Sequence, residues 1–346
     1  MRLLIIGIPE ATHVGGHFIK AAHDLGIDAN LRDSNAAFAG PKLLRMAVWH
    51  LMGRRPVRMR AFGAEVIDFC RRHRPEIVLT TGQAPVEAGV LRTLREMGLK
   101  LANFLTDDPW NPRHRAAWFM EALPCYDHIF TPRRANFPEL EALAAPRIHY
   151  LPFGYEPLIH HPPEPMTSEE QARWSSDVLF IGGGDIERAT VMRSLRDRGF
   201  NLSLWGGYWD RMSDLKAFAR GHAGPVEFRR LVACAGVNLC LVRQANRDGH
   251  SMRSFELPAV GGCMVVEDTE GHREIFGPDG ECVRYFSTMD ELATVVAELL
   301  AQPEKRRLMA DRVRQRVCLN GRNTYRDRLM AILDTCDSNV RSGAQI

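Results

Sequence analysis

Two stretches of this chain share one local pattern: an apolar run, then glycines, then an amphipathic segment. The first is Arg2–Pro9 (RLLIIGIP) with Gly15 and Gly16 behind it, and the second is Asp177–Arg188 (DVLFIGGGDIER). A short continuous apolar run is typical of a strand that is buried on both faces of a parallel sheet. A glycine turn that leads from such a strand into a helix opens a strand–helix–strand unit. The 346 residues therefore divide into two α/β halves.

Strands and helices alternate through both halves, and neither half carries the GxGxxG pattern of a dinucleotide site. The fold class predicted is α/β, with two Rossmann-like domains. In the first half we expect strands at 27–31, 77–82, 99–105, 127–131 and 148–151, with helices at 17–25, 85–97 and 133–143. In the second half we expect strands at 201–205, 236–242, 263–267 and 281–286, with helices at 225–235, 254–260, 288–301, 303–318 and 323–335.

A segment rich in proline and polar residues, 152–170, marks the boundary between the halves. We expect an N-terminal domain at 1–155, a linker at 156–174, a C-terminal domain at 175–320, and a helix and tail at 321–346 that pack back on the first domain. The tail from Ser338 onward is expected to fray. His160 and His161 are not expected to form a metal site, because adjacent residues rarely face one ligand.

Composition excludes several classes of protein. The net charge of +3, from 45 basic and 42 acidic residues, is no signature of nucleic-acid binding. The eight cysteines are scattered without a CxxC pair, which favours reduced thiols and a cytoplasmic location. The apolar run at 3–8 is too short for the core of a signal peptide, and no stretch approaches the ~20 apolar residues of a membrane span.

Residues 41–74 are unusually basic, with nine Lys and Arg against two acids. An apolar stripe accompanies the charges and consists of Leu43, Leu44, Val48, Trp49, Leu51 and Met52. One interpretation is peripheral contact with the inner, anionic face of a membrane. The other is a surface helix that exposes its basic face to solvent, and the sequence alone favours this second interpretation.

The stretch Asp248–Glu274 is the main candidate for chemistry. It predicts a loop, a short helix at 254–260, a turn at Gly261–Gly262 and a strand at 263–267. His250, Ser251 and Arg253 stand before or at the start of this helix, where free backbone N–H groups and the helix dipole suit a phosphate. Glu256 lies inside the helix, where a carboxylate can accept from sugar hydroxyls. The pattern therefore indicates a site for a nucleotide diphosphate.

Several motifs of the chain resemble those of a known family. They are FIGGGDIER, LWGG, MRSFELPAVGGCMVVEDTEGHREIF and GECVRYF in the second half, with NFLTDDPW, DHIFTPRRAN and YLPFGYEP in the first. The second half, from about 177 to 333, resembles the spore-maturation-protein-like glycosyltransferases, which are related to the family-4 enzymes. The resemblance implies a GT-B fold, in which two Rossmann-like domains face each other across a cleft. It also implies transfer of a sugar from a UDP-, GDP- or dTDP-sugar, with no tightly bound cofactor.

The resemblance assigns roles to individual residues. In a Glu-x7-Glu motif the first acid contacts the donor sugar and the second holds the ribose, and the matching positions here are Asp248 and Glu256. Asp248 is one methylene shorter than the family residue. Gly271 matches the turn after the motif. The Gly-Arg-x4-Lys loop that neutralises the diphosphate reads Gly182 to Arg188 here, so that Arg188 falls at the Lys position and Gly183 at the Arg position.

Other groups are needed to complete such a site. Arg253 is the best candidate to replace the missing arginine, and His250 is a second. Two helix N-termini, after Gly184 and after Arg253, offer further positive charge. By the resemblance, Gly15 and Gly16 match the loop of the first domain that touches the donor phosphates.

The chemistry expected is retaining and independent of metal, with the leaving phosphate accepting the acceptor proton. If the reaction inverts, a base is required, and Asp107 or Asp108 at the end of a strand is the candidate. The two acids are equally able to bind acceptor hydroxyls or to cap a helix. Trp205, Gly206 and Tyr208 stand where an aromatic ring stacks on the base, or else pack in the core. A 2-epimerase and a non-catalytic structural protein on the same fold remain alternatives, and the acceptor is unassigned.

Overall fold

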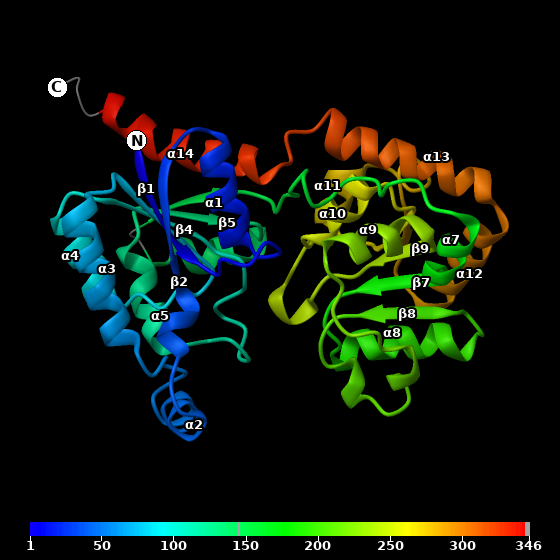
Figure 1. Ribbon diagram of the computed structural model, residues 1–346, viewed down its shortest axis with the longest axis horizontal. Coiled ribbons are helices and arrows are strands. Elements are labelled where there is room, and N and C mark those ends of the chain that lie inside the picture. The colour runs from blue at the N-terminus through cyan, green and yellow to red at the C-terminus, as the bar shows by residue number, and fades with distance from the viewer. Residues whose placement is uncertain (144–145, 343–346) are drawn as a thin grey trace. The chain divides into compact units, whose positions relative to one another are not determined.

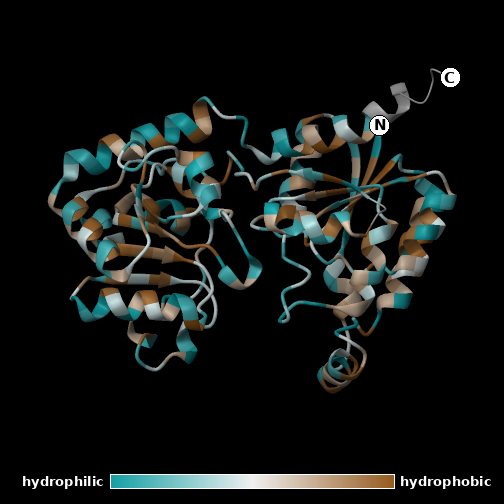
Figure 2. Ribbon diagram, turned by 180° about the vertical axis from the view of Figure 1, so that it is seen from behind, coloured by the Kyte–Doolittle hydropathy of each residue, from teal (hydrophilic) through white to brown (hydrophobic). Residues whose placement is uncertain are grey.

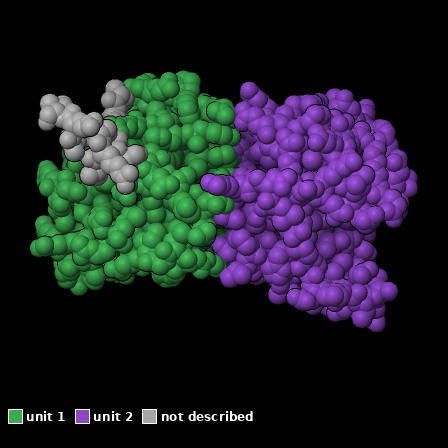
Figure 3. Space-filling view, turned by 90° about the horizontal axis from the view of Figure 1, so that it is seen from above, with its two compact units in different colours: residues 1–152, 244–248, 325–346 green, residues 153–243, 249–324 purple. Residues whose placement is uncertain are grey.

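The computed structural model describes residues 1–143 and 146–342, with the side chains up to 337 (Figure 1). The chain forms two compact units, which Figure 3 colours separately. Unit 1 consists of residues 1–152, 244–248 and 325–346, and unit 2 consists of residues 153–243 and 249–324. The chain therefore passes between the units four times rather than once.

Unit 1 contains a six-stranded sheet in the order β2-β1-β3-β4-β5-β6, in which every neighbouring pair is parallel. The strands are β1 (Arg2–Gly7), β2 (Asp28–Asp33), β3 (Ile77–Thr81), β4 (Lys100–Phe104), β5 (His128–Thr131) and β6 (Arg147–Tyr150). The helices are α1 (Val14–Asp24), α2 (Lys42–Leu51), α3 (Met59–His73), α4 (Ala88–Glu96), α5 (Ala117–Ala122), α6 (Phe137–Glu141) and α14 (Tyr325–Ser342), with short 3₁₀ turns η1 (Ser34–Phe38), η2 (Leu123–Cys125) and η3 (Arg134–Asn136).

Unit 2 contains a five-stranded parallel sheet in the order β11-β10-β9-β7-β8. The strands are β7 (Ser176–Ile181), β8 (Leu202–Trp205), β9 (Ala235–Cys240), β10 (Met264–Glu267) and β11 (Arg284–Phe286). The helices are α7 (Ser168–Trp174), α8 (Ile186–Asp197), α9 (Pro225–Cys234), α10 (Arg253–Val260), α11 (Glu270–Phe276), α12 (Met289–Ala301) and α13 (Pro303–Arg314). Unit 2 also has two 3₁₀ turns, η4 (Trp209–Arg211) and η5 (Lys216–Phe218), and a π-helical turn, η7 (Gln315–Leu319). The 3₁₀ turn η6 (Gln244–Asn246) belongs to unit 1.

The strands supply the centre of each core, as the brown colour of both sheets in Figure 2 shows. Leu3 to Ile6 on β1 and Ile77 to Leu79 on β3 are at most 1 % exposed. The continuous apolar runs therefore do mark strands that are covered on both faces. Two parallel sheets with alternating helices confirm the α/β class that the sequence predicts.

The structure differs from the sequence prediction in several places, and one of them is that residues 244–248, inside the predicted C-terminal domain 175–320, belong to unit 1. Helix α1 begins at Val14, so Gly15 and Gly16 lie in its first turn and not in a loop. The expected linker, 156–174, belongs to unit 2 and ends in α7, which Thr167 caps with Glu170 in a capping box. Helix α14 continues to Ser342, so residues 338–342 are helical instead of frayed, and the remainder of the expected tail, 343–346, lies outside the described residues.

Within the described ranges, no helix combines the length and the apolar character that a bilayer crossing requires. The eight cysteines are all free, as reduced thiols would be. Burial raises the pKa of the Cys70 thiol to about 11 and that of Cys263 to about 12, so these side chains pack as small apolar groups.

Candidate functional site

The carboxyl end of β7 is the point at which the predicted donor-binding segments of unit 2 meet. The backbone N–H of Gly182 donates to Trp205 O at 2.8 Å, and that of Gly184 donates to Gly207 O at 2.9 Å. From α10, Arg253 Nε donates to Ile181 O at 3.0 Å. The structure therefore brings the 182–184 loop, the turn after β8 and the start of α10 together, at the strand ends where open α/β sheets bind ligands.

Glycine is required at two positions of this junction and not at a third. Gly206 has φ +124°, and a Cβ there would lie 2.5 Å from Gly182 O. A Cβ on Gly184 would lie 2.9 Å from the Trp209 ring. A Cβ on Gly183 would meet nothing closer than 3.7 Å, which is an ordinary contact. Gly183 is thus the one glycine of the three at which the local backbone has room for a side chain.

Arg188 turns back onto the loop that precedes its helix. Its Nη1 donates to Gly183 O at 3.0 Å, and its guanidinium carbon lies 5.4 Å from the centre of the Phe180 ring. Asp185 caps α8, because its Oδ1 accepts from the Arg188 backbone N–H at 2.9 Å. A carboxylate therefore already occupies the helix N-terminus that the sequence analysis offers to a phosphate, so this terminus is less suited to an anion than expected.

Helix α10 carries the two residues on which the predicted site depends most. Arg253 and Glu256 lie one turn apart and form an ion pair between Arg253 Nη1 and Glu256 Oε2. The side chain of Arg253 is 32 % exposed, while that of Glu256 is 2 % exposed. No side chain caps the N-terminus of α10. A partly open cation that is backed by a buried carboxylate is a suitable arrangement for a phosphate and a neighbouring hydroxyl.

His160 is a member of this cluster that the sequence analysis missed. Its Nε2 lies 3.7 Å from Glu256 Oε1, and its side chain is 5 % exposed. The Glu156 backbone N–H donates to His160 Nδ1 at 3.1 Å, so a neutral ring carries its proton on Nε2, which faces the carboxylate. Since 95 residues of sequence separate His160 from Glu256, no local pattern pairs them. The only feature of the sequence that bears on His160 is its position in the segment 152–170, whose composition is typical of a linker.

The loop 249–252 is held against α11. A Cβ on Gly271 would lie 2.6 Å from Gly249 O, and Thr269 Oγ1 donates to the same oxygen at 2.6 Å. Ser251 lies at the start of α10, and its backbone N–H donates to Ser254 Oγ at 3.1 Å. Gly271 therefore allows the backbone of α11 to approach that of the loop 249–252 closely, and this contact fixes the loop that leads into α10.

His250 packs as an aromatic side chain. It is 2 % exposed, and its ring meets the rings of Phe153 and Phe255 edge-on, with centroids 5.9 and 5.6 Å away. This environment holds the loop in place. It favours a packing role for His250 over direct contact with a leaving group.

A buried serine–histidine contact ties α10 to α11. Ser254 Oγ donates to His272 Nε2 at 2.9 Å, and His272 Nδ1 donates to Glu267 O at 2.7 Å. His272 is fully buried, and this burial lowers its pKa to about 4. The ring is thus neutral at physiological pH and stabilises the position of α10 by two hydrogen bonds.

Trp205, which ends β8, and the two aromatic residues that follow it have different environments. Trp209 is fully buried and donates from Nε1 to Gly182 O at 2.8 Å. Trp205 is half-buried, with its Nε1 donating to Ser203 Oγ at 2.9 Å. Tyr208 is 55 % exposed, and Arg211 lies over its ring at 4.6 Å. Of the two aromatic residues predicted to stack on a base, Tyr208 is the exposed one.

In unit 1, the acidic pair that follows β4 is held in place by hydrogen bonds. Asp108 is 1 % exposed and accepts from the backbone of Trp110, from Asn136 and twice from Arg247, at 2.6–3.1 Å. Both of its oxygens are therefore occupied. Asp107 accepts from Thr106 Oγ1 and from Asn246 Nδ2, each at 3.3 Å, and is half-buried. Asp107 is the more available of the two predicted bases.

Asp248 is also part of unit 1, where it forms a buried ion pair with Arg133. The two side chains are 8 % and 2 % exposed. Arg133 further donates to Leu105 O at 3.2 Å and to Thr106 O at 2.6 Å, at the end of β4. The pair anchors the segment 244–248 to the sheet of unit 1, which is a structural role that the sequence analysis did not foresee for Asp248.

Gly15 and Gly16 pack tightly at the start of α1. A Cβ on Gly15 would lie 2.6 Å from Ile8 O, and one on Gly16 would lie 2.3 Å from Glu10 O. The two glycines therefore allow the helix to approach the loop that follows β1. Among the residues that the structure describes, no group of three or more His, Cys, Asp and Glu side chains is placed to hold a metal ion.

Comparison with known proteins gives one sequence match and many structural ones. Residues 188–334 match the model of a family described as glycosyl transferase-like, whereas a search of curated proteins found no match. The whole chain is similar to the sucrose-phosphate synthase of Thermosynechococcus elongatus, with 12 % identity, a TM-score of 0.72, and coverage of 99 % of this chain and 100 % of that one.

Two further structures bear on the alternatives. HepE of Anabaena, in complex with UDP-glucose, matches with 12 % identity and a TM-score of 0.67 over 97 % of this chain and 100 % of that one. A Listeria monocytogenes protein assigned as a UDP-N-acetylglucosamine 2-epimerase matches with 12 % identity and a TM-score of 0.56, over 97 % and 96 %. The chain therefore has the GT-B fold, and its residues 188–334 carry the sequence pattern of glycosyl transferase-like proteins.

Proposed function

We propose that this protein is a glycosyltransferase that moves a hexosyl group from a nucleotide-diphosphate sugar to an acceptor hydroxyl. The observation that carries the proposal is the match of residues 188–334 to a glycosyl transferase-like family, because this range includes Arg188, Arg253, Glu256 and the turn after β8. The contacts at the end of β7 place these residues around one junction. HepE, which shares the fold, binds UDP-glucose, and this supports a nucleotide-sugar donor here.

Each residue of the junction has a proposed role. The partly exposed guanidinium of Arg253 stabilises the leaving diphosphate, with Arg188 as a second cation. The buried carboxylate of Glu256 accepts from the ribose hydroxyls. Tyr208, which is exposed beside Gly183, stacks on the base. We assign no sugar contact to Asp248, since Arg133 holds its carboxylate within unit 1.

We propose a retaining transfer that needs no metal. The bond between the anomeric carbon and the β-phosphate oxygen breaks, that oxygen takes the proton of the acceptor hydroxyl, and the acceptor oxygen bonds to the anomeric carbon on the same face. The arginines then balance the charge that develops on the phosphate. The test is the anomeric configuration of the product from an α-linked donor. A β product would exclude this mechanism and would make Asp107 the proposed base.

A binding screen tests the function itself. UDP, GDP, dTDP and CMP and their sugars are added to the full chain, and the thermal midpoint is followed. We expect one nucleotide series to raise the midpoint, and the matching sugar to be transferred or slowly hydrolysed. If no nucleotide binds, the fold serves a non-catalytic, structural role. If a UDP-sugar is converted to its C2 epimer without any acceptor, the protein is an epimerase.

The acceptor and the cellular location follow from chemistry outside this junction. We propose an acceptor from a cell-envelope glycan, a polysaccharide or a secondary metabolite, each of which offers the required hydroxyl. The free and mostly buried cysteines favour a reducing compartment, and we therefore place the reaction in the cytoplasm. Extraction of the native protein with a thiol-trapping reagent tests this: disulfide-linked cysteines would contradict it.

A further inference from the structure

Helix α2 exposes its apolar side. Its leucines and small apolar residues recur at positions i, i+1, i+4, i+5 and i+8, which places them on one face. Leu43, Leu44 and Leu51 on this face are 80 %, 50 % and 84 % exposed, and no residue of α2 is buried. We call this face, which consists of Leu43, Leu44, Ala47, Val48 and Leu51, the apolar face of α2. Helix α2 is thus a surface helix, as the sequence analysis favours, but it exposes its apolar side as well as Lys42 and Arg45.

The sequence segment around α2 carries basic residues and no acids. Residues 34–64 contain no Asp or Glu, and their six basic residues are Lys42, Arg45, Arg54, Arg55, Arg58 and Arg60. Two of them are neutralised by acids beyond this range, since Arg55 pairs with Glu87 and Arg58 lies 3.5 Å from Glu65. Lys42 and Arg45 are exposed on α2 itself. The helix that bears the apolar face therefore also carries two exposed cations.

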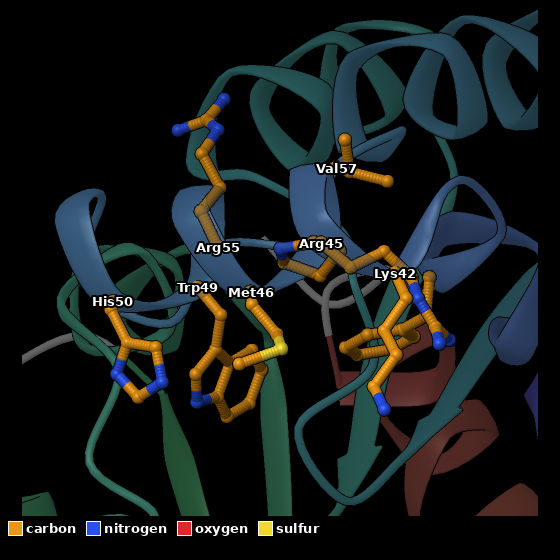
Figure 4. A pocket seen from close by; sticks show the side chains of 9 residues that line it. Lys42, Arg45, Met46, Trp49, His50, Arg55 and Val57 are labelled. Carbon is orange, nitrogen blue, oxygen red and sulfur yellow. The ribbon is translucent and has the colours of Figure 1, made fainter.

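A cavity of about 250 Å³ lies on the other side of α2 (Figure 4). Its lining combines Lys42, Arg45, Met46, Trp49 and His50 of α2 with Phe38, Arg55, Pro56 and Val57. Phe38 and Trp49 form aromatic walls, with ring centroids 6.2 Å apart. A cavity with apolar walls and cationic side chains suits a molecule that joins an anionic group to an apolar one.

The helix is too short to be stable by itself. It has ten residues, whereas isolated helices shorter than ~12–15 residues are marginal in water and depend on packing of their apolar face. Figure 1 shows α2 standing away from the sheet of its own unit, and the core of that unit contains none of its residues. We therefore expect an apolar surface from outside the described chain to cover the apolar face of α2.

We propose that α2 docks the protein on the surface of an anionic phospholipid bilayer. The apolar face enters the boundary between headgroups and acyl chains, and the exposed side chains of Lys42 and Arg45 pair with lipid phosphates. A second copy of the chain fits this surface less well, because pairing two copies of α2 would bring the exposed Lys42 and Arg45 of both copies together, and α2 itself has no acid to offset them. The proposal concerns where the protein works and is independent of the proposed sugar transfer.

The test is co-sedimentation of the full chain with lipid vesicles. We expect binding to vesicles that contain phosphatidylglycerol, little binding to pure phosphatidylcholine, and a loss of binding as salt screens the charges. The double variant Leu43→Ser with Leu51→Ser should lower the affinity at least tenfold. Both leucines are exposed, so its thermal midpoint should equal that of the parent. Leu158→Ser, at a leucine of unit 2 that is 70 % exposed, is the matched control and should bind as the parent does.

Two results would overturn the proposal. One is binding to anionic vesicles that the double variant retains in full, because the attachment would then lie elsewhere. The other is the absence of binding to anionic vesicles, and a dimer in solution that the double variant separates would then show that a second copy covers the apolar face. The variant Lys42→Glu with Arg45→Glu provides an independent check: it should weaken binding most at low salt, where the cations contribute most.

Discussion

Arg253 and Glu256, one turn apart on α10, form an ion pair with each other, and His160 faces the remaining side of the carboxylate. The residue proposed to bind the diphosphate and the residue proposed to bind the ribose are thus in direct contact. Charge on one of them affects the position of the other, so we expect their contributions to nucleotide binding to be coupled rather than additive.

Removal of Glu256 should abolish nucleotide binding. In Glu256→Ala the ribose loses its acceptor and Arg253 loses the partner that orients it, so calorimetry should detect no heat of binding.

Arg253→Ala should lower the rate of transfer by ~10²–10³, or ~2.7–4 kcal/mol of barrier, by analogy with the loss of one oxyanion donor. Arg273→Ala on α11 is the control, since Arg273 is half exposed and pairs with Asp268. Unchanged donor affinity in Glu256→Ala would refute the ribose assignment.

Loss of His160 should weaken nucleotide binding without abolishing it. The ring faces Glu256 at 3.7 Å and limits the positions that the carboxylate can take. His160→Ala should raise the Kd by about two- to tenfold, which corresponds to ~0.5–1.5 kcal/mol for one polar contact. His161→Ala is the matched control, because the Nδ1 of His161 hydrogen-bonds to the Pro162 carbonyl at 2.8 Å rather than facing Glu256. Equal affinities for both variants would mean that His160 has no part in positioning Glu256.

Gly183 offers a gain-of-function test. A Cβ on Gly183 would meet nothing closer than 3.7 Å, and the loop motif that the sequence resembles has an arginine at the matching position. Gly183→Arg should therefore fold normally and bind the nucleotide diphosphate about tenfold more tightly, through a new charge-assisted contact. Gly184→Arg is the contrasting variant, since the Trp209 ring leaves no room at 2.9 Å, and its thermal midpoint should fall. Weaker binding by a folded Gly183→Arg would contradict the placement of the phosphates beside this loop.

The buried pair of Arg133 and Asp248 should matter for stability. Asp248→Ala leaves a buried guanidinium without this partner, and we expect the free energy of unfolding to fall by roughly 3–5 kcal/mol. Chemical denaturation of the full chain measures this change. If Asp248 instead contacts the donor sugar, as the family motif implies, the variant should unfold like the parent while losing transfer activity.

Burial of His272 makes the protein sensitive to acid. Its pKa is about 4 in the folded state, against about 6.5 in an unfolded chain. The unfolded state therefore binds more protons between pH 6.5 and 4, and the stability is full above pH 6.5 and decreases as the pH falls through this window. The loss approaches ~3 kcal/mol near pH 4. His272→Asn should unfold more readily at pH 7 and show a flatter dependence of stability on pH in this window.

Much of the fold follows from sequence periodicity. The continuous apolar runs on β1, β3 and β7 locate buried parallel strands, and most predicted boundaries lie within a few residues of the observed ones. The exceptions have local causes. Helix α1 starts early because glycine alone tolerates the close carbonyls of Ile8 and Glu10, and the basic segment breaks between Met52 and Arg58, where Gly53 and Arg54 both have positive φ.

The candidate site was predictable only in part. The pattern around α10 identifies Arg253 and Glu256, because a helix start, a basic residue and an acid are adjacent in sequence. Contacts between distant segments are not visible in any local pattern. Neither the partnership of Arg133 with Asp248 nor that of His160 with Glu256 follows from periodicity, because tertiary packing alone brings these side chains together.

The path of the chain sets an order on folding during synthesis. Unit 1 contains two segments that are made late. Residues 244–248 supply Arg247, which pairs with Asp108, and Asp248, which pairs with Arg133. Helix α14 supplies Tyr325, whose ring stacks on His17 of α1 with centroids 4.4 Å apart. When the ribosome has made the first 152 residues, the sheet of unit 1 is complete but these partners are still absent. The N-terminal unit is thus the last to finish, and its unfinished face remains available to chaperones while unit 2 emerges.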